Sequence, residues 1–174
     1  MDALHEQKLF RMLLAKKAGG EELPLPVFCR VIEAIAKYDG SAAWCVGQGS
    51  GCSMLGAYLD SEISSKIWGE NTNGVLAWGP GKSEARAVEG GYLVTAKTMF
   101  VSGSHHATWL ATHCSTVYET DGSVRKSESG KPVILTTFIP AGETQLCDNW
   151  YVFGLRNTGS DGFELNEHFV PDAH

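Results

Sequence analysis

The chain changes its hydrophobic pattern once, near residue 74, and this change constrains the fold more than any other sequence feature. Before it, apolar residues recur at helical spacing, which predicts helices over residues 4–17, 27–38, 42–59 and 60–68. After it, β-branched and aromatic runs separated by turn residues predict strands at 75–78, 85–88, 92–98, 108–118, 132–139, 150–155 and 163–170. Helices followed by strands, without alternation, are typical of the α+β class. We expect a helical part (residues 1–73) leading into an antiparallel β-barrel or sandwich (residues 74–174).

The third expected helix is rich in small residues. Ser41 is a suitable N-cap for it, and Ala43, Gly47, Gly51 and Gly56 follow. Each glycine in a helix interior costs about 0.8–1 kcal/mol relative to alanine. Several glycines therefore indicate that another stretch of backbone, or a ligand, approaches this helix closely.

A two-glycine turn at Gly90-Gly91 predicts a hairpin. Glycine adopts the positive φ angles that a tight turn requires, so we expect residues 87–88 to pair antiparallel with residues 92–94. This hairpin leads directly into the most informative part of the chain.

The strand pattern breaks at Ser102-Gly103, just after Phe100. The break leaves a hydroxyl and unpaired backbone N–H groups beside an aromatic ring, where a flat ligand with polar edges could dock. The alternative interpretation is a bulge beside a buried phenylalanine. A serine hydrolase is not indicated, because the GxSxG motif is absent.

The charge distribution argues against nucleic acid and anionic membranes as partners. The 174 residues include 14 Lys plus Arg and 20 Asp plus Glu, for a formal net charge of −6, and the basic residues are scattered. No apolar run approaches the roughly 20 residues that span a bilayer, and no signal peptide opens the chain. Five cysteines without a CxxC pair indicate reduced, mostly buried thiols, so we expect a cytoplasmic protein.

Two polar clusters leave alternatives open. His105, His106, His113 and Cys114 are the densest group of potential metal ligands. Adjacent strand residues point to opposite faces, so we favour a histidine beside a cofactor or at the surface over a zinc or iron site. Arg156 could hold a phosphate or carboxylate of a ligand, or equally tie down an acidic loop.

Taken in order, four segments resemble the acyl-CoA dehydrogenase superfamily, and within it the branch of flavin-dependent monooxygenases that share the dehydrogenase fold. The segments are LHEQKLFRMLL, GGEELPLPVFCRVIEAIAKYDGSAAWCVGQGSG, GGYLVTAKTMFVSGSHHATWL and DNWYVFGLRNTGSDGFELNEHFVP. In that family a helical N-terminal domain, a β-barrel middle domain and a C-terminal four-helix bundle follow one another. The resemblance implies that residues 1–73 end the first domain, that residues 74–174 form the second, and that the bundle is absent from this chain.

The resemblance also implies a flavin cofactor, FAD or FMN, and a small organic substrate. Ser102 would polarise the flavin N5, Phe100 would wall the ring, and His106 could act as an acid or base. The residues implied to contact the cofactor are Trp78, Phe100, Val101, Ser102, Arg156, Thr158 and Ser160.

The chain also departs from the family pattern. Residues 77–80 read Ala-Trp-Gly-Pro where the dehydrogenases carry Thr-Glu-Pro, which argues against a fatty acyl-CoA substrate. Thr98 stands where the monooxygenase branch often has tryptophan.

We therefore predict that the parent protein carries out flavin-dependent monooxygenation or α,β-dehydrogenation of a small organic substrate, as a homo-oligomer. These 174 residues alone are expected to be inactive. The first alternative is a non-catalytic remnant that self-associates through apolar surface left bare by the missing bundle. The second is a metal-dependent hydrolase built on the histidine cluster.

Overall fold

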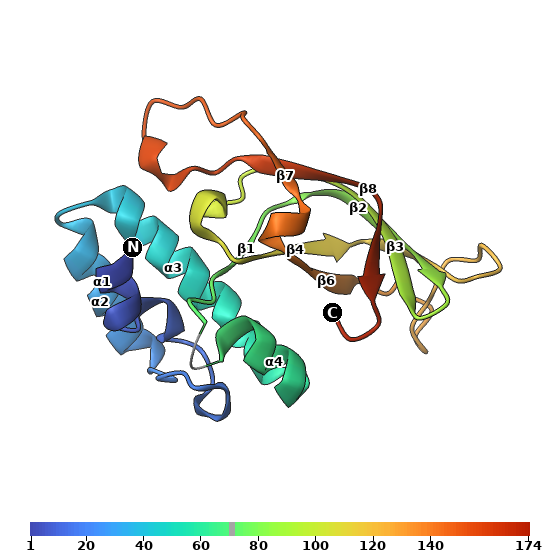
Figure 1. Ribbon diagram of the computed structural model, residues 1–174, viewed down its shortest axis with the longest axis horizontal. Coiled ribbons are helices and arrows are strands. Elements are labelled where there is room, and N and C mark those ends of the chain that lie inside the picture. Colours follow the sequence, from blue (N-terminus) through green and yellow to red (C-terminus); the bar gives the residue numbers. More distant parts are fainter. Residues whose placement is uncertain (70–71) are drawn as a thin grey trace.

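The computed structural model describes residues 1–69 and 72–174, with the helices gathered at one end and the strands at the other (Figure 1). The helices are α1 (Asp2–Glu6), α2 (Leu25–Ala36), α3 (Gly40–Ser53) and α4 (Ser61–Trp68), with 3-10 turns at Leu9–Arg11, Lys16–Ala18, Met54–Ala57, Ser104–His106, Ala141–Glu143 and Arg156–Thr158. The strands are β1 (Leu76–Trp78), β2 (Gly81–Val88), β3 (Gly91–Thr98), β4 (Trp109–Cys114), β5 (Thr116–Tyr118), β6 (Leu135–Pro140), β7 (Gln145–Cys147) and β8 (Gly162–Pro171). The predicted α+β class is confirmed. Within the described ranges, every helix is too short or too polar to cross a membrane.

The strands form two sheets rather than the predicted antiparallel barrel. One sheet has the order β1-β4-β6 and the other β5-β2-β3-β8-β7, and neither closes on itself among the described strands. β1 pairs with β4 and β2 with β5 in parallel. The reason is that β3 runs back along β2, after which β4 and β5, separated only by Ser115, resume the direction of β1 and β2. The strand expected at residues 108–118 is therefore divided between the two sheets.

The predicted hairpin at Gly90-Gly91 is confirmed. Gly90 has a φ of +77°, and Ala87 lies opposite Tyr92 across the β2–β3 pair. The turn thus sets the register of the two long strands at the centre of the larger sheet.

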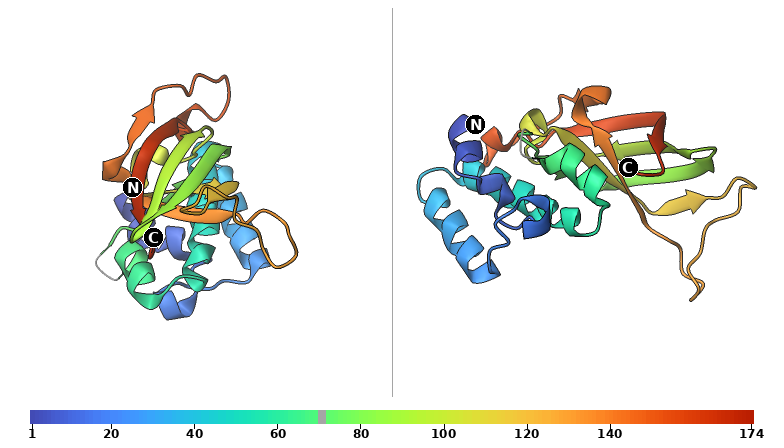
Figure 2. Two further views of the ribbon diagram at one scale, coloured as in Figure 1. Left: turned by 90° about the vertical axis from the view of Figure 1, so that its right-hand side faces the viewer. Right: turned by 60° about the horizontal axis from the view of Figure 1, so that its bottom comes forward.

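The three-stranded sheet is buried on both faces (Figure 2). Successive strand residues point to opposite faces, so each strand contributes to two cores. The residues that pack against the five-stranded sheet include Ala77, Leu110 and Ile139. The neighbouring residues Leu76, Ala111 and Phe138 pack against the helices, chiefly α3 and α4. This small sheet therefore joins the helical part to the rest of the molecule.

The helix predicted over residues 4–17 is wrong beyond α1. Only 3-10 turns follow α1, at Leu9–Arg11 and Lys16–Ala18, and Phe10, Met12 and Leu14 are buried at every second position rather than at helical spacing. The Arg11 guanidinium instead donates hydrogen bonds to three carbonyl oxygens at and beyond the C-terminus of α4, those of Trp68 (2.6 Å), Gly69 (2.9 Å) and Thr72 (2.9 Å). Packing of this segment against α3 and α4 overrides its helical periodicity.

Two predictions about single elements are also wrong. Asp39, not Ser41, caps α3, because its carboxylate accepts hydrogen bonds from the backbone N–H groups of Ser41 (2.8 Å) and Ala42 (3.0 Å). The aromatic run at residues 150–155 is not a strand but part of the loop between β7 and β8. The side chains of Tyr151 and Phe153 in this run are exposed.

The close approach expected at the small residues of this helix is made by side chains rather than by backbone, and it occurs at Gly49 of α3. A Cβ atom there would lie 2.7 Å from Cδ1 of Phe10 and 3.3 Å from Cγ1 of Val75. Gly51, two residues later, has no atom within 4 Å of the equivalent position. The requirement for glycine therefore belongs to one face of the helix, and it is imposed by a buried ring.

All five cysteines are unpaired, and three of them are buried as expected. Burial raises the pKa of Cys45 to about 11, with a contribution from Asp39, that of Cys52 to about 12 and that of Cys114 to about 11.

We predict opposite effects for two alanine substitutions in α3. Gly49→Ala should destabilise the fold by about 1–2 kcal/mol, because overpacking against Phe10 exceeds the gain in helix propensity. Gly51→Ala should stabilise it by up to about 1 kcal/mol. Urea denaturation of both variants measures the difference, and equal shifts of the same sign would contradict the packing argument.

Candidate functional site

An aromatic cavity of about 330 Å³ lies where α3, the end of β1, the segment after β3 and the β7–β8 loop meet. Its lining residues are Trp44, Gln48, Trp78, Pro80, Phe100, Ser102, Trp150, Leu155, Thr158 and Ser160. Four aromatic side chains and three hydroxyl groups thus face one space. Apolar walls with a few converging polar groups are typical of small-molecule sites.

Phe100 is held in a backbone conformation that non-glycine residues rarely adopt. Its φ is +56°, in the left-handed region. Its ring is half exposed and meets the ring of Trp150 edge-on, with centroids 5.9 Å apart. Backbone strain of this kind is concentrated at functional sites. The two rings form one corner of the cavity.

A row of hydrogen-bonded side chains lies along another side of the cavity. The Trp44 indole N–H donates to Ser102 Oγ (2.9 Å), which lies 2.9 Å from Ser160 Oγ. Ser160 Oγ lies 2.7 Å from Thr158 Oγ1, and Thr158 donates to the carbonyl oxygen of Leu155 (2.9 Å). We call these groups the hydroxyl row.

Asp161 anchors the β7–β8 loop. Its buried carboxylate accepts hydrogen bonds from the backbone N–H groups of Asn149 and Trp150, both at 2.8 Å, and its other oxygen lies 2.6 Å from His105 Nε2. Burial alone would raise the pKa of this carboxyl, but the contacts with His105 and the two amides outweigh it and lower the pKa below its ordinary value. The carboxylate thereby positions Trp150 at the cavity.

Further hydrogen bonds join Thr158 and Gly159 of this loop to the break after β3. The Gly103 N–H donates to Thr158 O (2.8 Å), and Ser104 Oγ donates to Gly159 O (2.8 Å). From α3, the Cys45 thiol contacts Thr158 O at 3.6 Å. Figure 1 shows the loop turning back toward the helical end of the molecule. Three segments distant in sequence are therefore fixed around one cavity.

The structure brings together five of the seven residues implied to contact a cofactor, namely Trp78, Phe100, Ser102, Thr158 and Ser160. Val101 does not line the cavity, because its side chain is fully buried in the core between the sheets. The side chain of Arg156 is exposed outside the cavity, and its guanidinium has no hydrogen bond or ion pair within the described residues.

The three histidines of the sequence cluster point to different partners. His106 packs against Phe10, with ring centroids 5.8 Å apart, and does not line the cavity. Burial, followed by nearby His5 and His105, lowers its pKa. His113 contacts Thr136 Oγ1 through Nδ1 (2.7 Å). In the described parts of the chain, no three His, Cys, Asp or Glu residues are grouped as metal ligands.

Sequence reasoning missed several residues of the site. Trp44 and Gln48 lie in the helix that is rich in small residues, where one large aromatic residue is the only sequence signal of a binding site. Trp150 and Leu155 were assigned to a strand that does not form. Asp161 directly follows the Thr-Gly-Ser segment, a position from which a carboxylate can cap neighbouring N–H groups.

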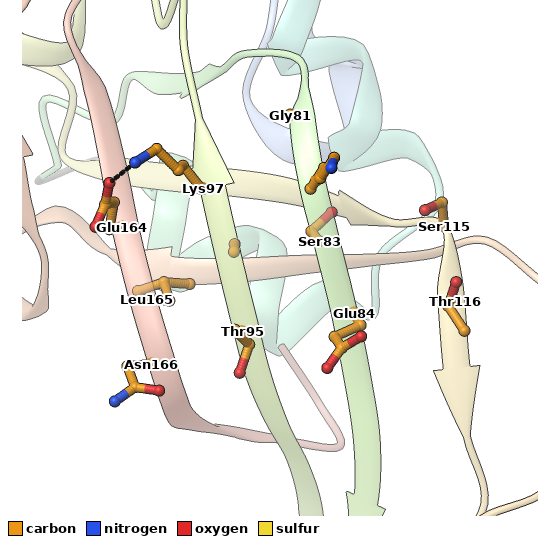
Figure 3. Close-up of a pocket in the computed structure, with 12 residues that line it drawn as sticks. Gly81, Ser83, Glu84, Thr95, Lys97, Ser115, Thr116, Glu164, Leu165 and Asn166 are labelled. Carbon is orange, nitrogen blue, oxygen red and sulfur yellow. Dashed lines mark ion pairs between the residues drawn. The ribbon is translucent and has the colours of Figure 1, made fainter.

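A larger hollow, of about 840 Å³, lies on the outer face of the five-stranded sheet (Figure 3). The side chains there stand on adjacent strands, and Lys97 reaches across to pair with Glu164 at 2.7 Å. Both charged groups are mostly exposed, and no aromatic side chain lines the hollow. These features are typical of a solvated sheet face, so the aromatic cavity is the better candidate site.

Comparison with known proteins finds sequence relatives that match most of this chain. The flavin-dependent monooxygenase oxygenase subunit HsaA of Rhodococcus jostii (strain RHA1) is 30% identical over 180 residues, covering 98% of this chain and 43% of the relative. An FADH(2)-dependent resorcinol hydroxylase oxygenase component from Rhizobium sp. (strain MTP-10005) is 30% identical over 158 residues, covering 88% and 35%. Both of these relatives of the chain are oxygenase components of flavin-dependent monooxygenases. This similarity agrees with the predicted resemblance to that branch.

Solved structures agree. The 3-HSA hydroxylase from Rhodococcus sp. RHA1 superimposes with a TM-score of 0.84 at 27% identity, covering 99% of this chain and 42% of that one. XiaF from Streptomyces sp., solved in complex with FADH2 and glycerol, has a TM-score of 0.87 and the same coverage; at 24% identity it supports the fold alone. No family model matches the chain. The chain spans about two fifths of the length of these homologues.

We predict that Asp161→Ala lowers the free energy of unfolding by about 1.5–3 kcal/mol at pH 7, the usual contribution of hydrogen bonds to a charged group. A carboxylate with a lowered native pKa stabilises the fold above its unfolded-state pKa and loses this effect as the pH falls through the native value. The difference from wild type should therefore shrink below the ordinary pKa of 3.8.

Urea denaturation across this pH range measures the effect. The matched control is Asp172→Ala, because Asp172 is exposed. A difference that grows at low pH, or an equally large loss in the control, would contradict the role assigned to Asp161.

Proposed function

We propose that this chain forms the flavin-binding wall of a reduced-flavin monooxygenase that acts on a small organic substrate. The observation that carries the proposal is the aromatic cavity, which gathers hydroxyls and aromatic rings from the segments that resemble the monooxygenase branch. Homology to flavin-dependent oxygenase components supports it. A bound flavin would supply the oxygen-activating chemistry, and the protein would bind and orient it.

The residues present fit such a cofactor. Phe100 and Trp150 would hold the flat ring system by stacking or edge contacts. Trp78, the last residue of β1, also lines the cavity. Ser102 is placed to meet the polar edge of the ring at N5. Arg156, whose charge is unpaired within the described residues, is available for a phosphate of FAD or FMN.

The relatives differ in the flavin named with them. The resorcinol hydroxylase component is named as FADH(2)-dependent, and KijD3, 18% identical to this chain, was solved with FMN. We propose one of these two flavins for this chain, in its reduced form.

We also propose a division of the chain at residue 73. Residues 1–73 would correspond to the end of an N-terminal helical domain and residues 74–174 to the middle domain of the longer homologues. The change from helices to strands between α4 and β1 supports this division. The cytoplasmic location of the parent protein, predicted from its cysteines, also stays a prediction.

Self-association is a second candidate function, supported by the outer surface of α2. None of the 12 residues of α2 is buried, although the helix is amphipathic. A shallow apolar groove runs along it, lined by Leu9, Val27, Arg30, Val31, Ala34, Ile35 and Tyr38. We propose that a second copy of this chain covers this α2 groove, because exposed apolar patches drive association.

The flavin proposal predicts that dihydro-FMN or dihydro-FAD, titrated anaerobically, quenches tryptophan fluorescence of the protein in a saturable way. Phe100→Ala should weaken binding about tenfold through loss of ring contacts. Phe153→Ala is the control, because Phe153 lies in the same loop region but is fully exposed and does not line the cavity. Absence of saturable quenching with both flavins would refute the proposed function.

The association proposal predicts that Ala34→Glu shifts the protein toward monomer in sedimentation velocity, because it places a charge in the α2 groove. Ala36→Glu should leave the distribution unchanged, since Ala36 is equally exposed on α2 but lies outside the groove. A wild-type protein that sediments as a monomer at high concentration would rule out this interface.

A further inference from the structure

We infer that the hydroxyl row makes Ser102 a hydrogen-bond acceptor toward the cavity and thereby favours reduced over oxidised flavin. The inference rests on the proposed function, because it concerns the ligand of the same cavity. It assigns the choice of flavin redox state to Ser160 and Thr158, which lie behind Ser102 in the row.

The two ends of the row set its direction. The Trp44 indole N–H can only donate a hydrogen bond, and the Leu155 carbonyl oxygen can only accept one. Between them lie three hydroxyls, each with a single proton to donate. The orientation of the protons therefore follows from counting donors along the row.

The counting begins at Thr158. Its proton is donated to Leu155 O, so the 2.7 Å contact with Ser160 must use the proton of Ser160. The 2.9 Å contact between Ser160 and Ser102 must then use the proton of Ser102. Ser102 also accepts from Trp44, which leaves its oxygen one further lone pair.

Ser102 therefore has no proton to offer the cavity. Its hydroxyl proton points to Ser160, and its backbone N–H donates to Phe100 O at 2.9 Å. What it can present to a ligand is the remaining lone pair of Oγ. A ligand atom that meets Ser102 without disturbing the row must itself carry a hydrogen.

The oxidised and reduced states of a flavin differ in whether N5 accepts or donates a hydrogen bond. In the oxidised ring N5 has a lone pair and accepts a hydrogen bond, whereas in the reduced ring N5 carries a hydrogen and donates one. The reduced ring thus complements Ser102 as the row stands.

The oxidised ring would require the row to reverse. Ser160 would then donate to Ser102, and Thr158 would donate to Ser160 instead of to Leu155. Leu155 O would keep the hydrogen bonds that it accepts from Trp150 Nε1 and from the Thr158 N–H, both at 3.2 Å, but the bond from the buried Thr158 hydroxyl would be lost on reversal. This loss corresponds to a preference for reduced flavin of about five- to tenfold.

Removing the acceptor behind Ser102 should abolish this contribution. In Ser160→Ala the Ser102 proton has no partner in the row and is available to N5 of the oxidised ring. Thr158→Val has the same effect by another route, because Ser160 can then donate to Ser102. Trp44→Phe is the matched control, since it removes a donor but leaves the direction of the row unchanged.

The experiment measures dissociation constants of wild type and these variants for oxidised and reduced FMN by anaerobic fluorescence titration, with circular dichroism to verify folding. Ser160→Ala and Thr158→Val should bind oxidised FMN about five- to tenfold more tightly than wild type does, and reduced FMN equally well. In Trp44→Phe the ratio of the two constants should stay within about twofold of wild type.

The outcomes distinguish failure of this inference from failure of the proposed function. Flavin binding by wild type, with an unchanged ratio in Ser160→Ala and Thr158→Val, overturns the inference and leaves the proposed function intact. A shift of equal size in Trp44→Phe also overturns it. If wild type binds neither form of FMN or FAD, the proposed function fails, and the inference fails with it.

Discussion

The three-stranded sheet β1-β4-β6 is the constraint on which the rest of the structure depends. Alternate residues of each strand supply two hydrophobic cores, one shared with the five-stranded sheet and one with the helices. A shift of one residue in any of its strands would exchange these two sets of side chains. The position of α3 relative to the strands is therefore determined by this sheet, and with it the relative position of Trp44 and Trp78 across the cavity.

The site itself is made by loops that the scaffold holds in place. Binding residues are commonly carried by loops on a rigid framework. Here hydrogen bonds hold the β7–β8 loop: Asp161 joins the two ends of the loop, and the row from Trp44 to Leu155 holds the residues between them. The polar groups that line the cavity also hold the β7–β8 loop in place, so binding of a ligand in the cavity depends on the stability of this loop.

Local signals in the sequence predicted that helices precede strands, and they predicted the Gly90-Gly91 hairpin. They did not predict where long-range contacts override local preference. Arg11 binds carbonyl groups at and beyond the C-terminus of α4, within a segment that looks helical from its sequence. The aromatic run that begins at Trp150 has high strand propensity, but Asp161 accepts the hydrogen bond of the first backbone N–H of the run. Neither contact is visible in the hydrophobic pattern, because one joins residues 57 positions apart and the other depends on a single carboxylate.

The buried thiols have a consequence for a protein proposed to handle oxygen. With a pKa of about 11, roughly one Cys45 thiol in ten thousand is ionised at neutral pH, and the thiolate is the form that oxidants attack. Cys45 lies behind the cavity wall, in contact with Thr158. An oxidant generated in the cavity would therefore meet, at Cys45, a thiol that is almost entirely protonated and shielded, whereas Cys29, on the outer surface of α2, is the exposed thiol of the chain.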